Sequence, residues 1–340
     1  MNILLSCVGR RSYLVEYFKS ALVGEGIVVG TNSEAFTSGM SACDKSYVVP
    51  AVNDEDYIPT LLDIAKKENI KMIISLFDID LPFLAKSKKL FQDEGIEIIV
   101  SSEKVIEIAN DKYLTYQFLK ENNFHTPKTF INLTEVLDLI NKSNLSFPLF
   151  IKPRFGMGSI GVYKADNIEE LNFFYKYVQK QITNSYLSKL SSKDLNSMVL
   201  IQEAIIGQEF GIDILNDLNG NFLINISKEK VAMRSGETDI SVVIKNTELD
   251  DLSEKLSSDL KHIGNLDIDV LFDGKNYYIL ELNPRFGGGF PFSYMAGANF
   301  PKMLIDLVNK DVLNLPKIKI GTKCLKKIVP IIYKDTLVNK

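Results

Sequence analysis

The chain has 340 residues, of which 46% are hydrophobic and 24% charged, and its formal net charge is -4. This is ordinary globular composition with length for two or three domains, and the lack of a long basic run argues against a nucleic-acid partner. Three scattered cysteines without a C-x-x-C motif, and only two histidines, exclude a cysteine zinc site and a multi-histidine metal site.

The N-terminal residues place Arg10 and Arg11 after a short apolar run, whereas a secretory signal peptide has its charges first. No apolar run approaches the roughly 20 residues of a membrane-spanning helix. The scattered cysteines suit a reducing compartment. We therefore expect a cytoplasmic protein with no membrane partner.

Strands and helices are predicted to alternate through the first hundred residues. The predicted strands cover residues 3–5, 27–30, 45–49, 71–76 and 96–100, and the predicted helices cover residues 13–22, 56–68 and 81–94. This alternation predicts an open parallel sheet, and ligands of such sheets bind beyond the carboxyl ends of the strands. The loops at residues 7–11 and 77–80 are therefore expected to line a pocket.

The rest of the chain is predicted to form a two-lobed α+β unit. Its predicted helices begin near Lys104, at Lys112 and at a Thr134 cap, and cover residues 168–181 and 249–263. Its predicted strands cover residues 129–131, 198–202, 209–215, 221–227, 241–244, 267–272 and 277–283. A polar segment at 183–197 is predicted to be a surface loop. The expected domains are an α/β domain (1–104), a small lobe (105–200) and a C-terminal lobe (201–340).

A glycine-rich segment lies between two apolar, strand-like runs. Its spacing is Gly156-x-Gly158-x-x-Gly161, with an apolar run and Lys152 before it and Val162 after it. A dinucleotide-binding loop runs from a strand into a helix, whereas this segment predicts a β-hairpin flap. The hairpin favours a mononucleotide clamp, with the Lys152 ammonium reaching the nucleotide. The alternative is a plain hairpin with a glycine-rich tip.

Carboxylates converge in a second predicted hairpin, around the Asp273-Gly274 turn. Pairing Phe272 with Tyr278 sets Asp269 opposite Glu281, and the strand period of two puts Asn283 on the same face. Such oxygen ligands suit Mg²⁺ that is also held by phosphates and water. Arg285 follows at once and suits a phosphate. The alternative is the solvated face of a half-buried hairpin.

These motifs occur in an order that resembles the ATP-grasp superfamily. The matching residues are Asp111-Lys112, Lys152 with the glycine hairpin, Gln202-Glu203 with Gly207-x-Glu209, and Asp269 followed by Glu281-x-Asn283-Pro-Arg285. The Asn-Pro-Arg ending is similar to the large subunit of carbamoyl-phosphate synthase and related carboxylate–amine ligases. The resemblance covers residues 105–300, and the preceding α/β domain resembles the domain that precedes this fold in those enzymes.

The resemblance implies an ATP site with Mg²⁺, or Mn²⁺, as cofactor. Lys112 and Lys152 would hold the phosphates and the adenine edge, under a flap that includes Gly156, Gly158 and Ser159. Gln202 to Ile205 would be the hinge between the lobes, with the backbone of Glu203 and Ile205 pairing with adenine. Glu209 would accept the ribose hydroxyls. Asp269, Glu281 and Asn283 would hold the magnesium ions, and Arg285 would steady the γ-phosphate or an acyl-phosphate.

The implied activity is an ATP-dependent carboxylate–amine, or carboxylate–thiol, ligase acting through an acyl-phosphate. Its partners would be small carboxylates and amines such as amino acids, and a homodimer is compatible with the resemblance. The acceptor cleft is predicted to be lined by residues of mixed charge, namely Arg10 or Arg11, Asp78 or Asp80, Arg234 and Gly288. Two alternatives stay open: a carbamoyl-phosphate-synthase-like module that forms carboxyphosphate or carbamate, and a non-catalytic nucleotide sensor. A protein kinase is disfavoured because no H-R-D or D-F-G motif occurs.

Overall fold

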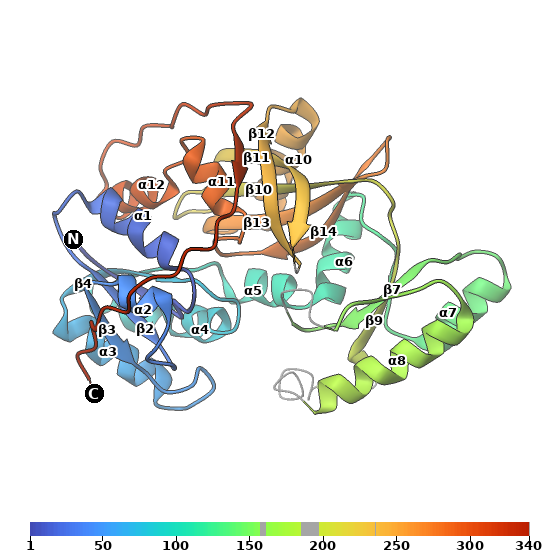
Figure 1. The fold of residues 1–340 in the computed structure, drawn as a ribbon, viewed down its shortest axis with the longest axis horizontal. Coiled ribbons are helices and arrows are strands. Elements are labelled where there is room, and N and C mark those ends of the chain that lie inside the picture. Colours follow the sequence, from blue (N-terminus) through green and yellow to red (C-terminus); the bar gives the residue numbers. More distant parts are fainter. Residues whose placement is uncertain (157–160, 185–196, 235, 340) are drawn as a thin grey trace.

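The computed structural model describes residues 1–156, 161–184, 197–234 and 236–339. They form an N-terminal domain with a parallel sheet, a small lobe, and a C-terminal lobe built on a large antiparallel sheet (Figure 1). A parallel open sheet followed by a two-lobed mixed unit confirms the predicted fold class.

The N-terminal sheet has the strand order β3-β2-β1-β4-β5 and is entirely parallel. Its strands are β1 (Asn2–Ser6), β2 (Val28–Asn32), β3 (Lys45–Val48), β4 (Ile70–Ser75) and β5 (Glu97–Ile99). Its helices are α1 (Ser12–Leu22), α2 (Ser38–Ala42), α3 (Tyr57–Lys67) and α4 (Leu81–Gln92). Because successive strand residues face opposite ways, Ile3 and Leu5 pack in the core that includes α1, and Leu4 packs in the one that includes α3 and α4.

The small lobe has a four-stranded sheet in the order β6-β9-β7-β8, which packs against α7 and α8. Its elements are β6 (Thr129–Phe130), α7 (Leu133–Asn141), β7 (Leu149–Pro153), β8 (Tyr163–Ala165), α8 (Ile168–Thr183) and β9 (Val199–Glu203). β9 runs across the predicted boundary at 200/201. The predicted Thr134 cap is wrong: Asn132 caps α7 and accepts from the backbone of Thr134 and Glu135. An Asn side chain at this position satisfies two free N–H groups.

The C-terminal lobe is built on a six-stranded sheet in the order β14-β13-β10-β11-β12-β15. Its elements are β10 (Gln208–Asn216), β11 (Phe222–Arg234), β12 (Glu237–Ile244), α10 (Thr247–Leu260), β13 (Gly264–Phe272), β14 (Tyr277–Asn283), α11 (Phe290–Met295), α12 (Phe300–Asn309) and β15 (Lys323–Leu325). Helices α5 (Glu103–Asn110), α6 (Lys112–Glu121) and α10 share one core with this sheet. The opposite face of β10 and β13 carries charged side chains.

The C-terminal lobe differs from the predicted elements in two places. β11 and β12 extend beyond the predicted strands at 221–227 and 241–244 to a hairpin in which Arg234 pairs with Glu237. Helices α11 and α12 follow the glycines after Arg285, where no helix was predicted. Backbone pairing with β12 holds the exposed end of β11. Helix α12 packs an apolar face against the N-terminal domain, and the sequence prediction missed the helical period of that face.

The C-terminal segment crosses back over the N-terminal domain (Figure 1). Leu337 forms a parallel bridge with Ser46 of β3, whose N–H donates to Thr336 O at 2.8 Å and whose carbonyl accepts from Val338 N at 3.0 Å. The chain therefore covers the outer edge of the parallel sheet with its own backbone, which satisfies that edge.

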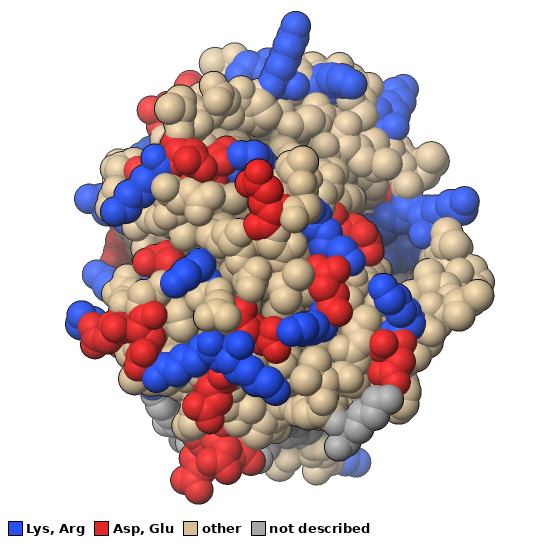
Figure 2. All heavy atoms as spheres, turned by 90° about the vertical axis from the view of Figure 1, so that its left-hand side faces the viewer, with Lys and Arg blue, Asp and Glu red and all other residues tan. Residues whose placement is uncertain are grey.

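The outer surface carries charges of both signs. Figure 2 shows acidic and basic side chains interspersed over one face of the molecule, without a large area of a single sign. Among the described residues, no helix combines the length and apolar character needed to span a membrane.

One buried histidine gives the fold a dependence on acid. His262 lies at the entry to β13, is fully buried, and has no partner for Nε2. Burial lowers its pKa to about 3. Below about pH 6.5 His262 binds a proton in the unfolded chain but stays neutral in the folded chain. The free energy of unfolding therefore decreases as the pH falls below 6.5.

We predict that His262→Asn reduces the loss of unfolding free energy between pH 6.5 and 4.5 by about 3 kcal/mol relative to the parent. Unfolding by urea at several pH values measures this. His125→Asn is the matched control because His125 is the other histidine of the chain and is exposed. An equal pH dependence in the parent and in His262→Asn would contradict the prediction.

Candidate functional site

The base of the glycine hairpin presents a lysine to the space between the lobes. Lys152 is on β7, and its Nζ donates to Gln202 Oε1 on β9 at 2.7 Å. The amide of Gln202 in turn donates to Thr129 Oγ1 at 2.8 Å. The predicted ATP residues Gly158 and Ser159 lie outside the described residues, whereas Gly156 is described. Gln202 thus fixes the position of Lys152.

A second lysine approaches from α6. Lys112 is the first residue of that helix, and its Nζ donates to the carbonyl of Gly156. Asp111 caps the helix and also accepts from Arg154 Nε at 2.8 Å and from Nη2 at 2.7 Å. This bidentate ion pair joins α6 to the end of β7. It therefore brings both predicted phosphate-binding lysines to one place.

The charges at this place are mutually dependent. Burial and the neighbouring Lys112 lower the pKa of Lys152 to about 8, whereas Glu281 raises it. Burial also lowers the pKa of Lys112. Burial raises the pKa of Glu281, but Lys112 and Lys152 outweigh it and the net shift is downward. Two cations opposite one carboxylate leave an excess of positive charge, which suits a polyphosphate.

The carboxylate hairpin forms as predicted at its centre but not at its turn. Asp269 pairs with Glu281, and Asp267 pairs with Asn283. The predicted pairing of Phe272 with Tyr278 is wrong, since Phe272 pairs with Tyr277. A register shift beside Asp269 restores the alignment, because β14 has one more residue than β13 between the turn and Glu281.

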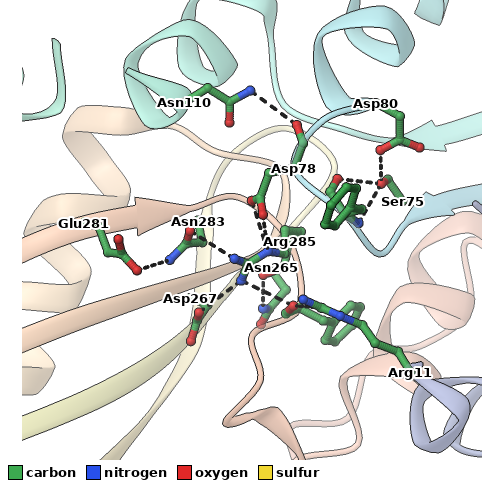
Figure 3. Close-up of polar contacts among 12 residues, drawn as sticks. Arg11, Ser75, Asp78, Asp80, Asn110, Asn265, Asp267, Glu281, Asn283 and Arg285 are labelled. Atoms are coloured by element: carbon green, nitrogen blue, oxygen red, sulfur yellow. Dashed lines mark hydrogen bonds and ion pairs between the residues drawn. The ribbon is translucent and has the colours of Figure 1, made fainter. Parts of the chain in front are cut away.

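Arg285 joins this hairpin to the N-terminal domain (Figure 3). Its Nε lies 3.0 Å from Asp78 Oδ1, its Nη1 lies 3.1 Å from Asp267 Oδ2, and its Nη2 donates to Asn283 Oδ1 at 3.0 Å. Burial alone would lower the pKa of Arg285, but these carboxylates and Glu281 raise it. The guanidinium is therefore permanently charged, and its position is set by both the N-terminal domain and the carboxylate hairpin.

The predicted metal ligands fit magnesium only with help from a nucleotide. In the described part of the chain no three His, Cys, Asp or Glu side chains converge on one ion position. Glu281, Asn283 and Asp269 offer two carboxylates and one amide, which are the hard oxygen donors that Mg²⁺ prefers. Phosphates and water would supply its other ligands. The metal role of the three residues stays a prediction.

A lysine that the sequence prediction missed occupies the same face. Lys230 Nζ lies 2.6 Å from Asp269 Oδ1 and 2.7 Å from Glu209 Oε1. Glu209, predicted to bind ribose, is therefore held in an ion pair. Lys228 and Lys230 alternate along β11 with the strand period, which is the signal that could have placed them on one face.

The predicted hinge connects β9 to β10. Glu203 pairs with Lys128 in both directions: its N–H donates to Lys128 O at 2.9 Å, and its Oε2 accepts from Lys128 N at 3.1 Å. Ile205 is half-buried and Gly207 packs against Phe272, where a Cβ would meet the carbonyl oxygen at 1.9 Å. Adenine binding by this segment stays a prediction.

The predicted acceptor residues separate into buried and exposed groups. Arg11 donates through Nη1 to the carbonyl of Phe286, beside Arg285. Asp80 is fully buried and accepts from Ser6, Ser75 and Tyr57, so this geometry favours Asp78 of the predicted pair. Figure 3 shows Arg11, Asp78, and Asp80 with its partner Ser75.

Arg10 and Arg234 lie at the outside. Arg10 is exposed, and the Arg234 side chain is 64% exposed with Nη2 3.0 Å from Asp239 Oδ2. A Cβ at Gly288 would lie 4.0 Å from Glu237 Cδ and 3.9 Å from Lys326 Nζ. Glu237 is the first residue of β12, and its pKa is lowered by Lys326 and further by Arg10 and Arg11. It was missed because the segment between the predicted strands carried no motif.

Comparison with known families agrees with this geometry. Residues 109–289, more than half of the chain, match the model described as an ATP-grasp domain. The chain belongs to the ATP-grasp family of enzymes. Residues 3–99 match the model of a PylC-like N-terminal domain. The resemblance inferred from the motifs is therefore confirmed.

The chain is similar in sequence to part of a much longer protein. It is 27% identical over 280 residues to the carbamoyl phosphate synthase large chain of Clostridium perfringens, covering 79% of this chain and 24% of that protein. The chain thus spans about a quarter of the length of that relative.

Two solved structures share the fold at lower identity. The biotin carboxylase domain of 2-oxoglutarate carboxylase from Hydrogenobacter thermophilus, a dimer in complex with MgADP, ADP and bicarbonate, has a TM-score of 0.73 and 17% identity, covering 95% of this chain and 73% of that chain. An L-amino acid ligase from Bacillus licheniformis has a TM-score of 0.71 and 20% identity, covering 92% and 76%.

The contacts of Arg285 with Asp78, Asp267 and Asn283, here called the Arg285 clamp, depend on a glycine. A Cβ at Gly287 would lie 2.2 Å from the carboxylate of Asp267, whereas one at Gly288 would meet nothing closer than 3.9 Å. We predict that Gly287→Ala lowers the free energy of unfolding by about 1–3 kcal/mol, because Asp267 must leave its place against Arg285. Thermal unfolding measures this, with Gly288→Ala as the matched control. Equal stability of the two variants would disprove the dependence on Gly287.

Burial lowers the pKa of Lys152 to about 8, so a nucleotide bound by this lysine is expected to bind in a pH-dependent way. We predict that ADP affinity falls above about pH 8, approaching tenfold per pH unit, because the neutral amine no longer attracts phosphate. Lys152→Arg should flatten this profile, since a guanidinium stays charged. Calorimetric titrations from pH 7 to 9.5 measure the affinity, and Lys128→Arg, an exposed lysine near the hinge, is the control. A flat profile for the parent protein would contradict the assignment.

Proposed function

We propose that this chain is an ATP-dependent ligase that joins a small carboxylic acid to an amine and releases ADP and phosphate. The observation that carries the proposal is the meeting of Lys112, Lys152 and Glu281, from three separate elements, beside the Arg285 clamp. The lysines face the predicted position of the triphosphate. Arg285 faces the N-terminal domain, where we place the acceptor.

The proposed reaction has two steps. A carboxylate oxygen attacks the γ-phosphorus, the bond from that phosphorus to the bridging oxygen breaks, and ADP leaves. The nitrogen lone pair of the amine then attacks the acyl carbon, phosphate leaves with the bonding electrons, and the nitrogen loses a proton. When bound, Mg²⁺ neutralises charge on the transferring phosphoryl group. A thiol acceptor would follow the same course.

The protein contributes orientation and fixed charge to these steps. Lys112 and Lys152 hold the phosphates, and the strands of the flap cover them so that water is kept from the acyl-phosphate. Arg285 is the candidate for holding the acyl-phosphate, because its guanidinium is buried, charged and fixed by Asp78 and Asp267. A fixed donor loses little entropy when the anion forms.

We place the acceptor between Arg11, Asp78 and Gly288, with Arg10, Glu237 and Lys326 at its outer side. Positive and negative groups alternate there, which suits a zwitterion such as an amino acid. An Arg fork would bind its carboxylate, and a carboxylate would bind its ammonium group. The role first given to Arg234 remains a prediction, and its exposed side chain is paired with Asp239. Action in the cytoplasm and a homodimeric state remain predictions.

A second candidate is a module that forms carboxyphosphate or carbamate. Its support is the 27% identity to a carbamoyl phosphate synthase large chain. In that case bicarbonate takes the place of the organic acid, and ammonia that of the amine. A sensor without chemistry is the least supported alternative, because both lysines, the carboxylate pair and Arg285 are all present and converge.

The test is phosphate release from ATP with a matrix of acids, including bicarbonate, and amines, with the products identified by mass spectrometry. We expect release to require one acid and one amine, and Glu281→Gln to reduce it by at least 100-fold with unchanged thermal unfolding, since the variant removes a charge from the centre. Glu248→Gln on the exposed start of α10 is the control. Stimulation by bicarbonate alone would favour the second candidate, and nucleotide binding without turnover would favour the sensor.

A further inference from the structure

A lysine side chain crosses one strand of the large sheet to reach the next. In the sheet, β10 lies between β11 and β13, and Gly211 on β10 pairs with Lys228 on one side and Asp269 on the other. A Cβ at Gly211 would lie 3.2 Å from Lys230 Cε and 4.0 Å from Asp269 Oδ1. The stem of Lys230 therefore passes over Gly211, where any larger residue would crowd it.

The crossing ends between two carboxylates. The Lys230 ammonium lies 2.6 Å from Asp269 Oδ1 and 2.7 Å from Glu209 Oε1, and the side chain is only 7% exposed. Its two partners come from β13 and β10. Gly211 leaves room for the Lys230 stem, and the two carboxylates bind its ammonium group from two sides. Together they form a defined, buried site for one positive charge.

The other predicted metal ligands also face fixed cations. Asn283 Oδ1 accepts from Arg285 Nη2 at 3.0 Å, and Asn283 Nδ2 donates to Glu281 Oε1 at 3.3 Å. Glu281 faces Lys112 and Lys152. Asp269 differs from Glu281 in that, within the described ranges, one cation is paired with it, and that cation is Lys230. Little negative charge is left for two dications beside the phosphates.

We propose that the Lys230 ammonium stands in for one divalent ion of the nucleotide site, so that the nucleotide complex holds one Mg²⁺ and not two. Glu281 and Asn283, with the phosphates, hold that one ion. The inference rests on the proposed function only in requiring that a nucleotide binds here. It removes Asp269 from the metal ligands and makes it the anchor of an internal cation.

The test counts metal ions without using turnover. Mn²⁺ serves as the probe, because its free ion is measured directly by electron paramagnetic resonance, and the nucleotide is a non-hydrolysable ATP analogue. The complex is freed of excess nucleotide and titrated with Mn²⁺. We expect one bound ion in the parent protein, one in Lys230→Arg, and two in Lys230→Met, in which the carboxylates of Glu209 and Asp269 are released.

Two further variants keep the test decisive. Lys230→Gln, which removes the charge and keeps a hydrogen-bond donor, replaces the methionine variant if that one fails to fold, and is also expected to bind two ions. Lys245→Met removes a surface lysine that is paired with Asp250, and should bind one. Two ions in the parent, or one ion in every folded Lys230 variant, would overturn this inference and leave the ligase proposal intact. Absence of nucleotide binding would overturn both.

Discussion

The guanidinium of Arg285 is the contact on which the arrangement of this protein depends. It is held by Asp78 from the N-terminal domain and by Asp267 and Asn283 from the carboxylate hairpin. A buried charge of this kind is tolerated only when its partners are in place. The clamp therefore links the position of the N-terminal domain relative to the carboxylate hairpin to the geometry of the predicted phosphoryl-transfer site. Asn265, which donates to the carbonyl of Arg285 at 2.9 Å, and Arg11, which donates to that of Phe286, hold the backbone around it.

Side chains alternate along each strand of the large sheet, so one face of the sheet packs in a core and the other carries the charged groups of the site. One face of β10 and β13 carries Ile212, Ile214 and Ile268, which share a core with α5, α6 and α10. The other face carries charges from four neighbouring strands. Acidic and basic side chains alternate on it, so most charges are neutralised locally and the lysines opposite Glu281 keep a positive excess. That excess supports nucleotide binding, and the remaining pairs support a defined geometry.

Much of the fold followed from local patterns. The N-terminal alternation of strands and helices, the hairpin at Asp273-Gly274 and the central pairing of Asp269 with Glu281 were all predictable, because hydrophobic period and turn residues act over short distances. The order of the motifs then indicated the ATP-grasp family, which the match over residues 109–289 confirmed. The turn register was wrong by one residue, because a register shift within a strand pair leaves no local mark in the sequence.

The sequence by itself determined which residue types are available and in what order: two lysines, a glycine hairpin, and a carboxylate pair ending in Arg285. Only the tertiary structure decided their partners. Lys230 reaches Asp269 because Gly211 on the intervening strand has no side chain, and these three positions are separated by tens of residues. The same holds for Asp78 with Arg285, which are distant in the chain and meet through domain packing. Long-range packing and ion pairing depend on the whole fold, and a local pattern cannot specify them.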